Sequence, residues 1–139
     1  MRFLVLLILL TACRPGEPSP APAGPPAVTL PESIRLLKPA EAAALIDSLP
    51  RLHVIDCRMD EEFQHGRIAG AHHVNHFKPE QAREYLNRLE RERPVLVYCA
   101  LGGRAGRTAL LLHEMGFRDV SVLEGGFAAW QQQGLPVAR

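Results

Sequence analysis

The chain of 139 residues has few cysteines, almost no net charge and only one long hydrophobic run. Three cysteines, an odd number, cannot form a self-contained disulfide framework, so each one needs its own explanation. The formal charge of +1 comes from 16 basic and 15 acidic residues. It argues against a nucleic-acid-binding protein, which would carry a clear excess of basic residues on one surface. The length accommodates a single ordinary domain.

The hydrophobic run lies at the N-terminus and is typical of an export signal. Arg2 precedes eight apolar residues, at positions 3 to 10, whereas a bilayer-spanning helix needs about 20. The following Leu10-Thr-Ala-Cys13 resembles the lipobox of bacterial lipoproteins, in which the cysteine is diacylated and becomes the first residue after cleavage. The resemblance implies a signal peptide over residues 1–12, lipidation of Cys13 and attachment to a lipid bilayer through N-terminal acyl chains. The alternative is an ordinary secretory signal with a cysteine near its cleavage site.

A proline-rich segment follows the lipobox. Seven of the 12 prolines lie between positions 14 and 31, among Gly, Ala and Ser, with almost no large apolar side chains. Such a segment cannot bury enough surface to fold, and proline favours an extended polyproline II conformation. We interpret residues 13–32 as the lipidated cysteine and a tether, and expect the protein in the bacterial cell envelope, anchored by lipid and facing the periplasm. A proline-rich ligand for a partner domain is the alternative.

From residue 33 onward, short β-rich runs alternate with helical segments. Helices are expected to begin near residues 39, 79, 104 and 127 and to end near 47, 92, 115 and 133. The expected strands are 34–36, 53–56, 72–75, 95–98 and 120–123. This alternation predicts one α/β domain over residues 33–139, with a central parallel β-sheet flanked by helices.

The residues that predict a reactive site follow the apolar run at 95–98. Cys99 follows this strand, and Ala100-Leu-Gly-Gly103 lead to Arg104, where a helix is expected to start. Ligands of parallel α/β sheets bind beyond the carboxyl ends of the strands. Consecutive glycines allow several backbone N–H groups to point at one spot, and the helix N-terminus and Arg104 add positive charge. A cysteine there is expected to be a nucleophilic thiolate. The alternative is a buried cysteine beside a tight turn.

Four segments in the same order resemble the rhodanese family. The loop from Val97 to Arg104 resembles the active-site loop of the family. Its other motifs are matched by Asp56-Cys-Arg58 with Glu62-Phe63, by Ile68-Ala-Gly-Ala71, and by Gly116-Phe117 through to Gly125-Gly126-x-x-x-Trp130. The resemblance covers about residues 33 to 139 and implies the rhodanese-like three-layer fold and sulfurtransferase activity. Arg67, Ala69 and Ala105 depart from the family's usual His, Pro and Ser without removing a group that the chemistry needs.

The resemblance also implies a mechanism. The loop from Cys99 to Arg104 has six residues, the length associated with sulfurtransferases, whereas the related phosphatases and arsenate reductases have one more. Cys99 is the implied catalytic residue, which carries sulfane sulfur as a persulfide. The implied substrate-binding residues are Ala100, Leu101, Gly102, Gly103 and Arg104. A small anionic donor such as thiosulfate supplies the sulfur, a thiol or cyanide accepts it, and no cofactor or metal is expected. A carrier or binding module without turnover is the alternative, and a phosphatase or arsenate reductase a distant one.

Other polar residues are interpreted as structural. Cys57 is expected to be a small core residue, the alternative being a redox partner of Cys99 in an oxidising periplasm. Asp56 and Arg58 are expected to tie the end of a strand to neighbouring loops, and Trp130 to pack over the sheet. A metal site formed by His72, His73 and His76 is disfavoured, because neighbouring residues on a strand point to opposite faces.

Overall fold

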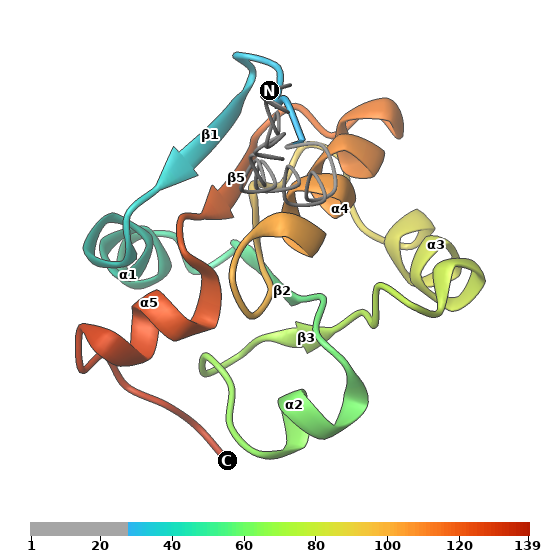
Figure 1. The fold of residues 1–139 in the computed structure, drawn as a ribbon. Helices are drawn as coiled ribbons and strands as arrows, with labels where there is room; N and C mark the ends of the chain where they lie inside the picture. The colour runs from blue at the N-terminus through green and yellow to red at the C-terminus, as the bar shows by residue number, and fades with distance from the viewer. Residues whose placement is uncertain (1–27) are drawn as a thin grey trace, which may run out of the picture.

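Residues 28–139 are described by the computed structural model, and they form a three-layer α/β domain (Figure 1). The sheet has the strand order β1-β5-β4-β2-β3, and all neighbouring strands are parallel. The strands are β1 (Ile34–Leu37), β2 (His53–Asp56), β3 (His72–His73), β4 (Val95–Tyr98) and β5 (Val120–Leu123). The predicted α/β fold with a central parallel sheet is confirmed. The predicted signal peptide 1–12, the lipidation site Cys13 and the tether up to residue 27 lie outside the described residues.

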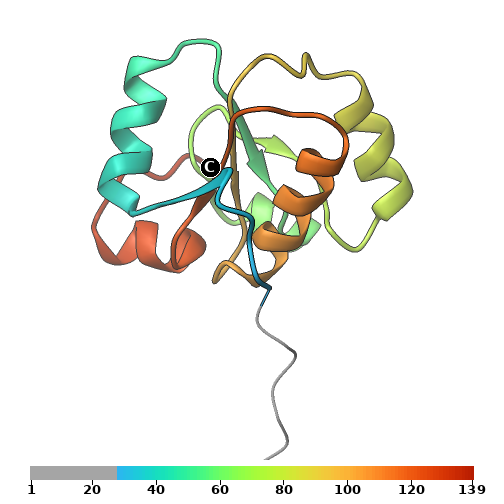
Figure 2. The same cartoon turned by 90° about the horizontal axis from the view of Figure 1, so that it is seen from above.

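Helices cover both faces of the sheet (Figure 2). On one face lie α1 (Pro39–Ser48) and α5 (Gly126–Gln132), and on the other lie α3 (Pro79–Asn87) and α4 (Gly103–Glu114). The short α2 (Asp60–Gln64) follows β2 directly. The two faces have separate hydrophobic cores, because side chains alternate along each strand.

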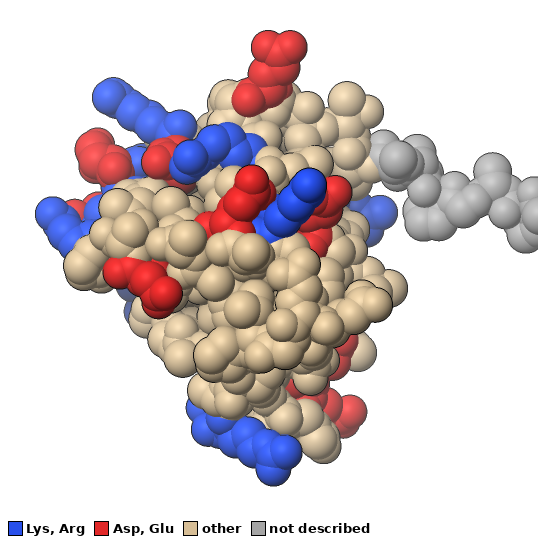
Figure 3. Space-filling view, turned by 90° about the vertical axis from the view of Figure 1, so that its left-hand side faces the viewer, with Lys and Arg blue, Asp and Glu red and all other residues tan. Residues whose placement is uncertain are grey.

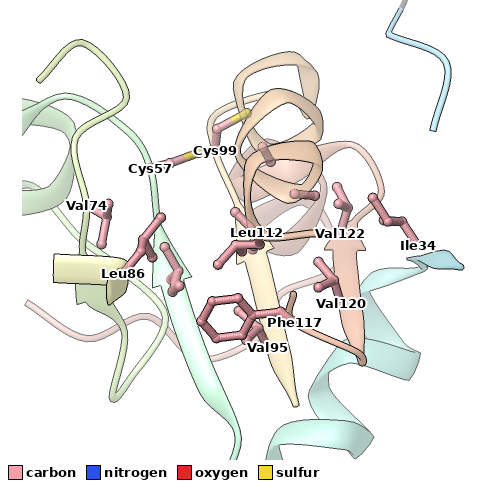
Figure 4. Close-up of a cluster of buried hydrophobic side chains, with 14 of the residues drawn as sticks. Ile34, Cys57, Val74, Leu86, Val95, Cys99, Leu112, Phe117, Val120 and Val122 are labelled. Atoms are coloured by element: carbon pink, nitrogen blue, oxygen red, sulfur yellow. The ribbon is translucent and has the colours of Figure 1, made fainter. Parts of the chain in front are cut away.

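The central strand β4 carries the chain into the candidate site. All four of its residues are buried. Leu96 and Tyr98 belong to the core beneath α1 and α5, whereas Val95 and Val97 belong to the core beneath α3 and α4. The same alternation places the next odd-numbered residue, Cys99, on the α3 and α4 side (Figure 4). The apolar run at 95–98 is thus a strand buried on both faces, as its composition predicts.

Three elements differ from the sequence predictions. Helix α2 was not predicted, because it has only five residues and buries none of them, so it leaves no apolar stripe in the sequence. Helix α3 ends at Asn87 instead of near residue 92, since the N–H groups of Arg88 and Leu89 bond carbonyls three residues back and the chain turns toward β4. Strand β3 has only two residues, although Val74 still donates an N–H to the carbonyl of Asp56 at 2.8 Å.

Charges of both signs are mixed on the face that carries α1 and α5. Figure 3 shows acidic and basic side chains next to one another in its upper part, above a broad area without charged side chains. This face therefore carries no basic patch of the kind that binds a nucleic-acid backbone. No helix within residues 28–139 has the length and apolar composition needed to cross a membrane.

Candidate active site

The loop between β4 and α4 curls around the sulfur of Cys99. The N–H of Gly102 donates a hydrogen bond to Sγ of Cys99 at 3.0 Å. Gly102 has φ of +117°, a conformation that residues with a Cβ rarely adopt. Helix α4 begins one residue later, at Gly103, so its N-terminus also points toward the sulfur. Cys99 is 1% exposed, and its sulfur lies at the bottom of the loop instead of on the surface.

Helix α5 fixes the orientation of this loop from outside. The N–H of Phe127 donates to the carbonyl of Cys99 at 2.7 Å, and the N–H of Ala128 donates to the carbonyl of Ala100 at 3.1 Å. In a trans peptide the carbonyl and the following N–H point in opposite directions. Holding these two carbonyls outward therefore turns the N–H groups of Ala100 and Leu101 toward the inside of the loop. This anchoring by α5 was not predicted from the sequence. The signal for it in the sequence is the pair Gly125-Gly126 at the start of α5.

The surroundings of Cys99 stabilise its thiolate. A hydrogen bond with the thiol of Cys57 and the backbone N–H groups of Ala105, Gly102 and Leu101 lower the pKa of Cys99 to about 5, although burial acts in the opposite direction. Two of these donors, Gly102 and Leu101, belong to the predicted loop, whereas the contributions of Cys57 and Ala105 were not anticipated. At neutral pH this cysteine is therefore a thiolate, the form that attacks sulfur.

Cys57 is a buried partner of Cys99. Its thiol lies 3.2 Å from the carbonyl of Tyr98, and it also interacts with the sulfur of Cys99 and the side chain of Thr108. A thiol has a single proton, so it can serve only one of these acceptors at a time. The negative charge of the Cys99 thiolate attracts that proton most strongly. The pKa of Cys57 is raised, first by this hydrogen bond with Cys99 and then by burial, and Cys57 stays protonated. The predicted placement of Cys57 in the core is confirmed.

The pH dependence of alkylation tests this arrangement. Alkylation of Cys99 by iodoacetamide requires the thiolate, so its rate is expected to rise with pH through a midpoint near 5 and to level off above it. An unperturbed thiol would keep gaining reactivity up to a pH of about 8.5. In Cys57→Ala the midpoint moves to higher pH because a donor is lost, whereas Cys57→Ser retains a donor and stays closer to the wild type. Peptide mass spectrometry of the Cys99 peptide measures the rate, and equal midpoints in all three proteins would contradict the role of Cys57.

Arg104 is held by a carboxylate. Its two terminal nitrogens donate to the two oxygens of Glu62 at 2.8 and 3.1 Å, a bidentate pair that joins α4 to α2. Glu62 in turn accepts the N–H of Met59 at 2.9 Å. The pair with Arg104 lowers the pKa of Glu62, and the same contact raises the pKa of Arg104. Arg104 thus braces the start of α4, and its charge is paired with that of Glu62.

A second, more deeply buried ion pair lies at the end of β2. The guanidinium of Arg58 donates to both oxygens of Asp56, at distances of 2.6 to 3.0 Å, and to the carbonyl of Gly66 at 2.6 Å. It also lies over the ring of Phe127 at 4.1 Å. These contacts tie the strand to the following loop and to α5, so Asp56 and Arg58 have the structural role predicted for them. Trp130 is likewise buried, and its indole N–H donates to the carbonyl of Pro136 at 2.9 Å.

The rim of the loop is apolar. Leu101 at the tip is 75% exposed, and the exposed ring of Phe77 lies 5.8 Å from the guanidinium of Arg104. A groove of about 330 Å³ runs along one side of the loop and is lined mainly by apolar groups, including Leu101, Leu36 and Val28. Apolar side chains at this position suit a ligand that brings some hydrophobic surface to the loop.

The histidines do not form a cluster. His73 stacks on Phe63 with ring centroids 4.5 Å apart, whereas His72 contacts Tyr85. His76 lies near the loop, with Nδ1 3.4 Å from the hydroxyl of Thr108. Burial and the charges of Arg107 and Arg104 lower its pKa. Within residues 28–139, no group of three or more His, Cys, Asp or Glu side chains is placed to hold a metal ion.

The fold and loop define a protein with a cysteine thiolate at the carboxyl end of a central parallel strand, surrounded by backbone N–H groups. A sequence model of the rhodanese-like domain matches residues 38–133, and the chain belongs to the rhodanese-like domain family.

Named relatives agree with this membership. The thiosulfate sulfurtransferase GlpE of Vibrio cholerae is 30% identical over 96 residues, which cover 69% of this chain and 88% of the relative. That of Shewanella oneidensis is 33% identical over 81 residues, covering 58% and 77%. Among solved structures, a rhodanese-related protein from Thermoplasma volcanium has a TM-score of 0.64 and 30% identity, covering 75% of this chain and 97% of the other. A protein of unknown function from Rhodopseudomonas palustris, described as a possible tyrosine phosphatase, has a TM-score of 0.65 and 28% identity, covering 76% and 86%.

Proposed function

We propose that this protein is a thiosulfate sulfurtransferase that carries sulfane sulfur on Cys99. The observation that carries the proposal is the Cys99 thiolate, whose sulfur accepts the N–H of Gly102 inside a loop of six residues. The similarity to proteins named thiosulfate sulfurtransferase supports the same reaction class.

The reaction consists of two displacements. The Cys99 thiolate attacks the outer sulfur of thiosulfate, the S–S bond of the donor breaks, and sulfite leaves with the electron pair. The product is a persulfide anion on Cys99. The N–H groups that hold the thiolate are positioned to hold this negative charge as well. A thiol or cyanide then attacks the outer sulfur and takes it away, which restores the Cys99 thiolate.

Turnover separates an enzyme from a carrier without turnover. With thiosulfate and cyanide, the protein is expected to form many molecules of thiocyanate per chain, measured as the coloured iron complex. A single thiocyanate per chain from a protein whose Cys99 is still a free thiol afterwards would instead assign it to a sulfur carrier. Hydrolysis of a generic phosphate monoester, measured in parallel, would favour the phosphatase alternative, which the six-residue loop disfavours.

We also propose that the chain is a lipoprotein of the bacterial cell envelope, anchored at Cys13 and facing the periplasm. The support is the sequence Leu10-Thr-Ala-Cys13 after the apolar run. Val28 lines the groove beside the active-site loop, so the chain enters the domain next to the site. The 15 residue steps from Cys13 to Val28 span about 47 Å at the ~3.1 Å per residue of an extended polyproline II chain. The site would therefore work within that distance of the membrane.

Fatty-acid labelling of bacteria that express the full chain tests the anchor. The wild type is expected to incorporate the label and to sediment with membranes. Cys13→Ser is expected to lose the label while keeping the domain folded, because Cys13 lies far outside the region matched to the family. An exported wild-type protein that carries no lipid would contradict the anchor and leave the sulfurtransferase proposal untouched.

A further inference from the structure

Cys57 is a second sulfur beside the nucleophile, and the two displacements do not use it. It follows β2 directly, just as Cys99 follows β4. The register of these parallel strands pairs Asp56 with Tyr98, so the next pair along is Cys57 and Cys99. The N–H of Cys57 still donates to the carbonyl of Tyr98 at 2.9 Å, which extends the strand pairing to this position. The two cysteines are therefore neighbours across adjacent strands.

Both side chains are on the same face of the sheet. They belong to the single core cluster beneath α3 and α4, and Figure 4 shows the side chain of Cys57 directed toward Cys99. Adjacent strands lie about 4.8 Å apart. The Cα separation in a disulfide is about 4.4 to 6.8 Å, so this pair meets the distance requirement without movement of the strands.

The position of Cys57 restricts what it can react with. Cys57 is fully buried, so a reagent in solution reaches Cys99 through the loop before it reaches Cys57. Its thiol lies next to the carbonyl of Tyr98, the hydroxyl of Thr108 and the sulfur of Cys99. The only reactive partner among them is Cys99.

The state of Cys99 controls the reactivity of Cys57. While Cys99 is a thiolate, the hydrogen bond between the two raises the pKa of Cys57 and keeps it protonated. When Cys99 carries a second sulfur, the negative charge moves to the outer atom, toward the N–H groups of the loop. The inner sulfur is then electrophilic, and Cys57 is the nearest thiol to it.

We propose that Cys57 is an internal acceptor that attacks the inner sulfur of the Cys99 persulfide, forms a Cys57–Cys99 disulfide and releases sulfide. This inference rests on the proposed function, because it requires the persulfide. The bond between Sγ of Cys57 and Sγ of Cys99 forms, and the bond between Sγ of Cys99 and the outer sulfur breaks. The outer sulfur leaves as hydrosulfide with the electron pair and the proton of Cys57.

The sulfane sulfur is itself the oxidant in this step. It is reduced to sulfide while the two cysteines are oxidised to a disulfide, so no further oxidant is needed. A thiol or dithiol reductant is needed to restore the Cys99 thiolate. This reductant attacks the disulfide at the sulfur of Cys99, because that sulfur lies in the loop. The acceptor class implied by this route is a reducing dithiol, and the net products from thiosulfate are sulfite, sulfide and an oxidised dithiol.

A single-turnover experiment without air tests the proposal. The full chain is reduced, freed of reductant, mixed with thiosulfate and separated from small molecules. Sulfite and sulfide are then measured, and the protein is alkylated and analysed by intact mass and by non-reducing peptide mapping. The wild type is compared with Cys57→Ala and with Cys57→Ser, whose hydroxyl keeps a donor toward Cys99 but cannot form a disulfide.

We expect the wild type to release about one sulfide per sulfite and to contain a peptide pair joined through Cys57 and Cys99. Both variants are expected to release sulfite, keep the added sulfur and release no sulfide. If the wild type keeps its persulfide as long as the variants do and releases no sulfide, the proposal is wrong while the sulfurtransferase assignment stands. If none of the three proteins releases sulfite or gains sulfur, the proposed function itself is wrong.

Discussion

Replacing Cys99 with alanine is expected to reduce thiocyanate formation to the rate without protein, a loss on the order of a thousandfold or more, because the reaction has no other nucleophile in the loop. Cys99→Ser should be nearly as inactive, since a serine hydroxyl is not ionised in this environment. Loss of activity in Cys99→Ser is the stronger result, because serine has almost the size of cysteine and leaves the loop packed.

An exposed, distant substitution provides the control for Cys99. Glu84 lies on α3 and, within residues 28–139, forms its ion pair with Arg88 at the surface, so Glu84→Ala is expected to keep full activity. Circular dichroism of both Cys99 variants verifies that they are folded. If a folded Cys99→Ala keeps a tenth or more of the wild-type rate, Cys99 is not the nucleophile.

Replacing Gly126 with alanine is expected to damage both the stability and the active site. A Cβ at this position would lie 2.5 Å from the carbonyl oxygen of Cys99 and 2.6 Å from that of Ala100, far inside van der Waals contact. Gly126 also has φ of +62°, which costs roughly 1–2 kcal/mol for a residue with a Cβ. Overpacking adds about 1–3 kcal/mol. We therefore expect urea denaturation to show a loss of about 2–5 kcal/mol.

Activity should fall with the Gly126 substitution in conditions where the protein remains folded. The new Cβ meets the carbonyls that Phe127 and Ala128 hold outward, so it must shift the peptide groups that turn N–H groups toward the sulfur. The pKa of Cys99 should rise accordingly, seen as a higher midpoint for its alkylation.

Gly134 is the matched control for this substitution. It has φ of +68°, but nothing lies within 4 Å of its would-be Cβ. Gly134→Ala should therefore cost only the conformational strain, roughly 1–2 kcal/mol, and leave the activity unchanged. Equal losses of stability in the two variants would show that the close approach of α5 to the loop contributes nothing.

The sequence predicted the features that depend on local pattern. The apolar run at 95–98 and the glycine pair after Cys99 place a strand, a loop and a helix in order, and the structure has them so. The sequence alone could not predict contacts between segments that are distant in the chain. The pairing of Arg104 with Glu62 spans 42 residues, and the anchoring of the loop by Phe127 depends on how α5 packs.

The prediction for Cys57 was limited in the same way, because its burial could be predicted from the sequence but its neighbour could not. A cysteine at the end of a buried strand is expected in the core, and it lies there. That it neighbours Cys99 follows from the pairing of β2 with β4, which sequence alone does not specify. Helix α2, which is too short to show periodicity, supplies the carboxylate that holds Arg104.

The most direct test of the account is the intact mass of Cys57→Ser after reaction with thiosulfate without air. This variant keeps a donor to Cys99 and cannot discharge the persulfide internally, so its mass reports the first displacement alone. We predict a gain of one sulfur atom, located on the Cys99 peptide and removed by cyanide with formation of one thiocyanate. A folded protein that gains no sulfur, or gains it on a residue other than Cys99, would contradict the account.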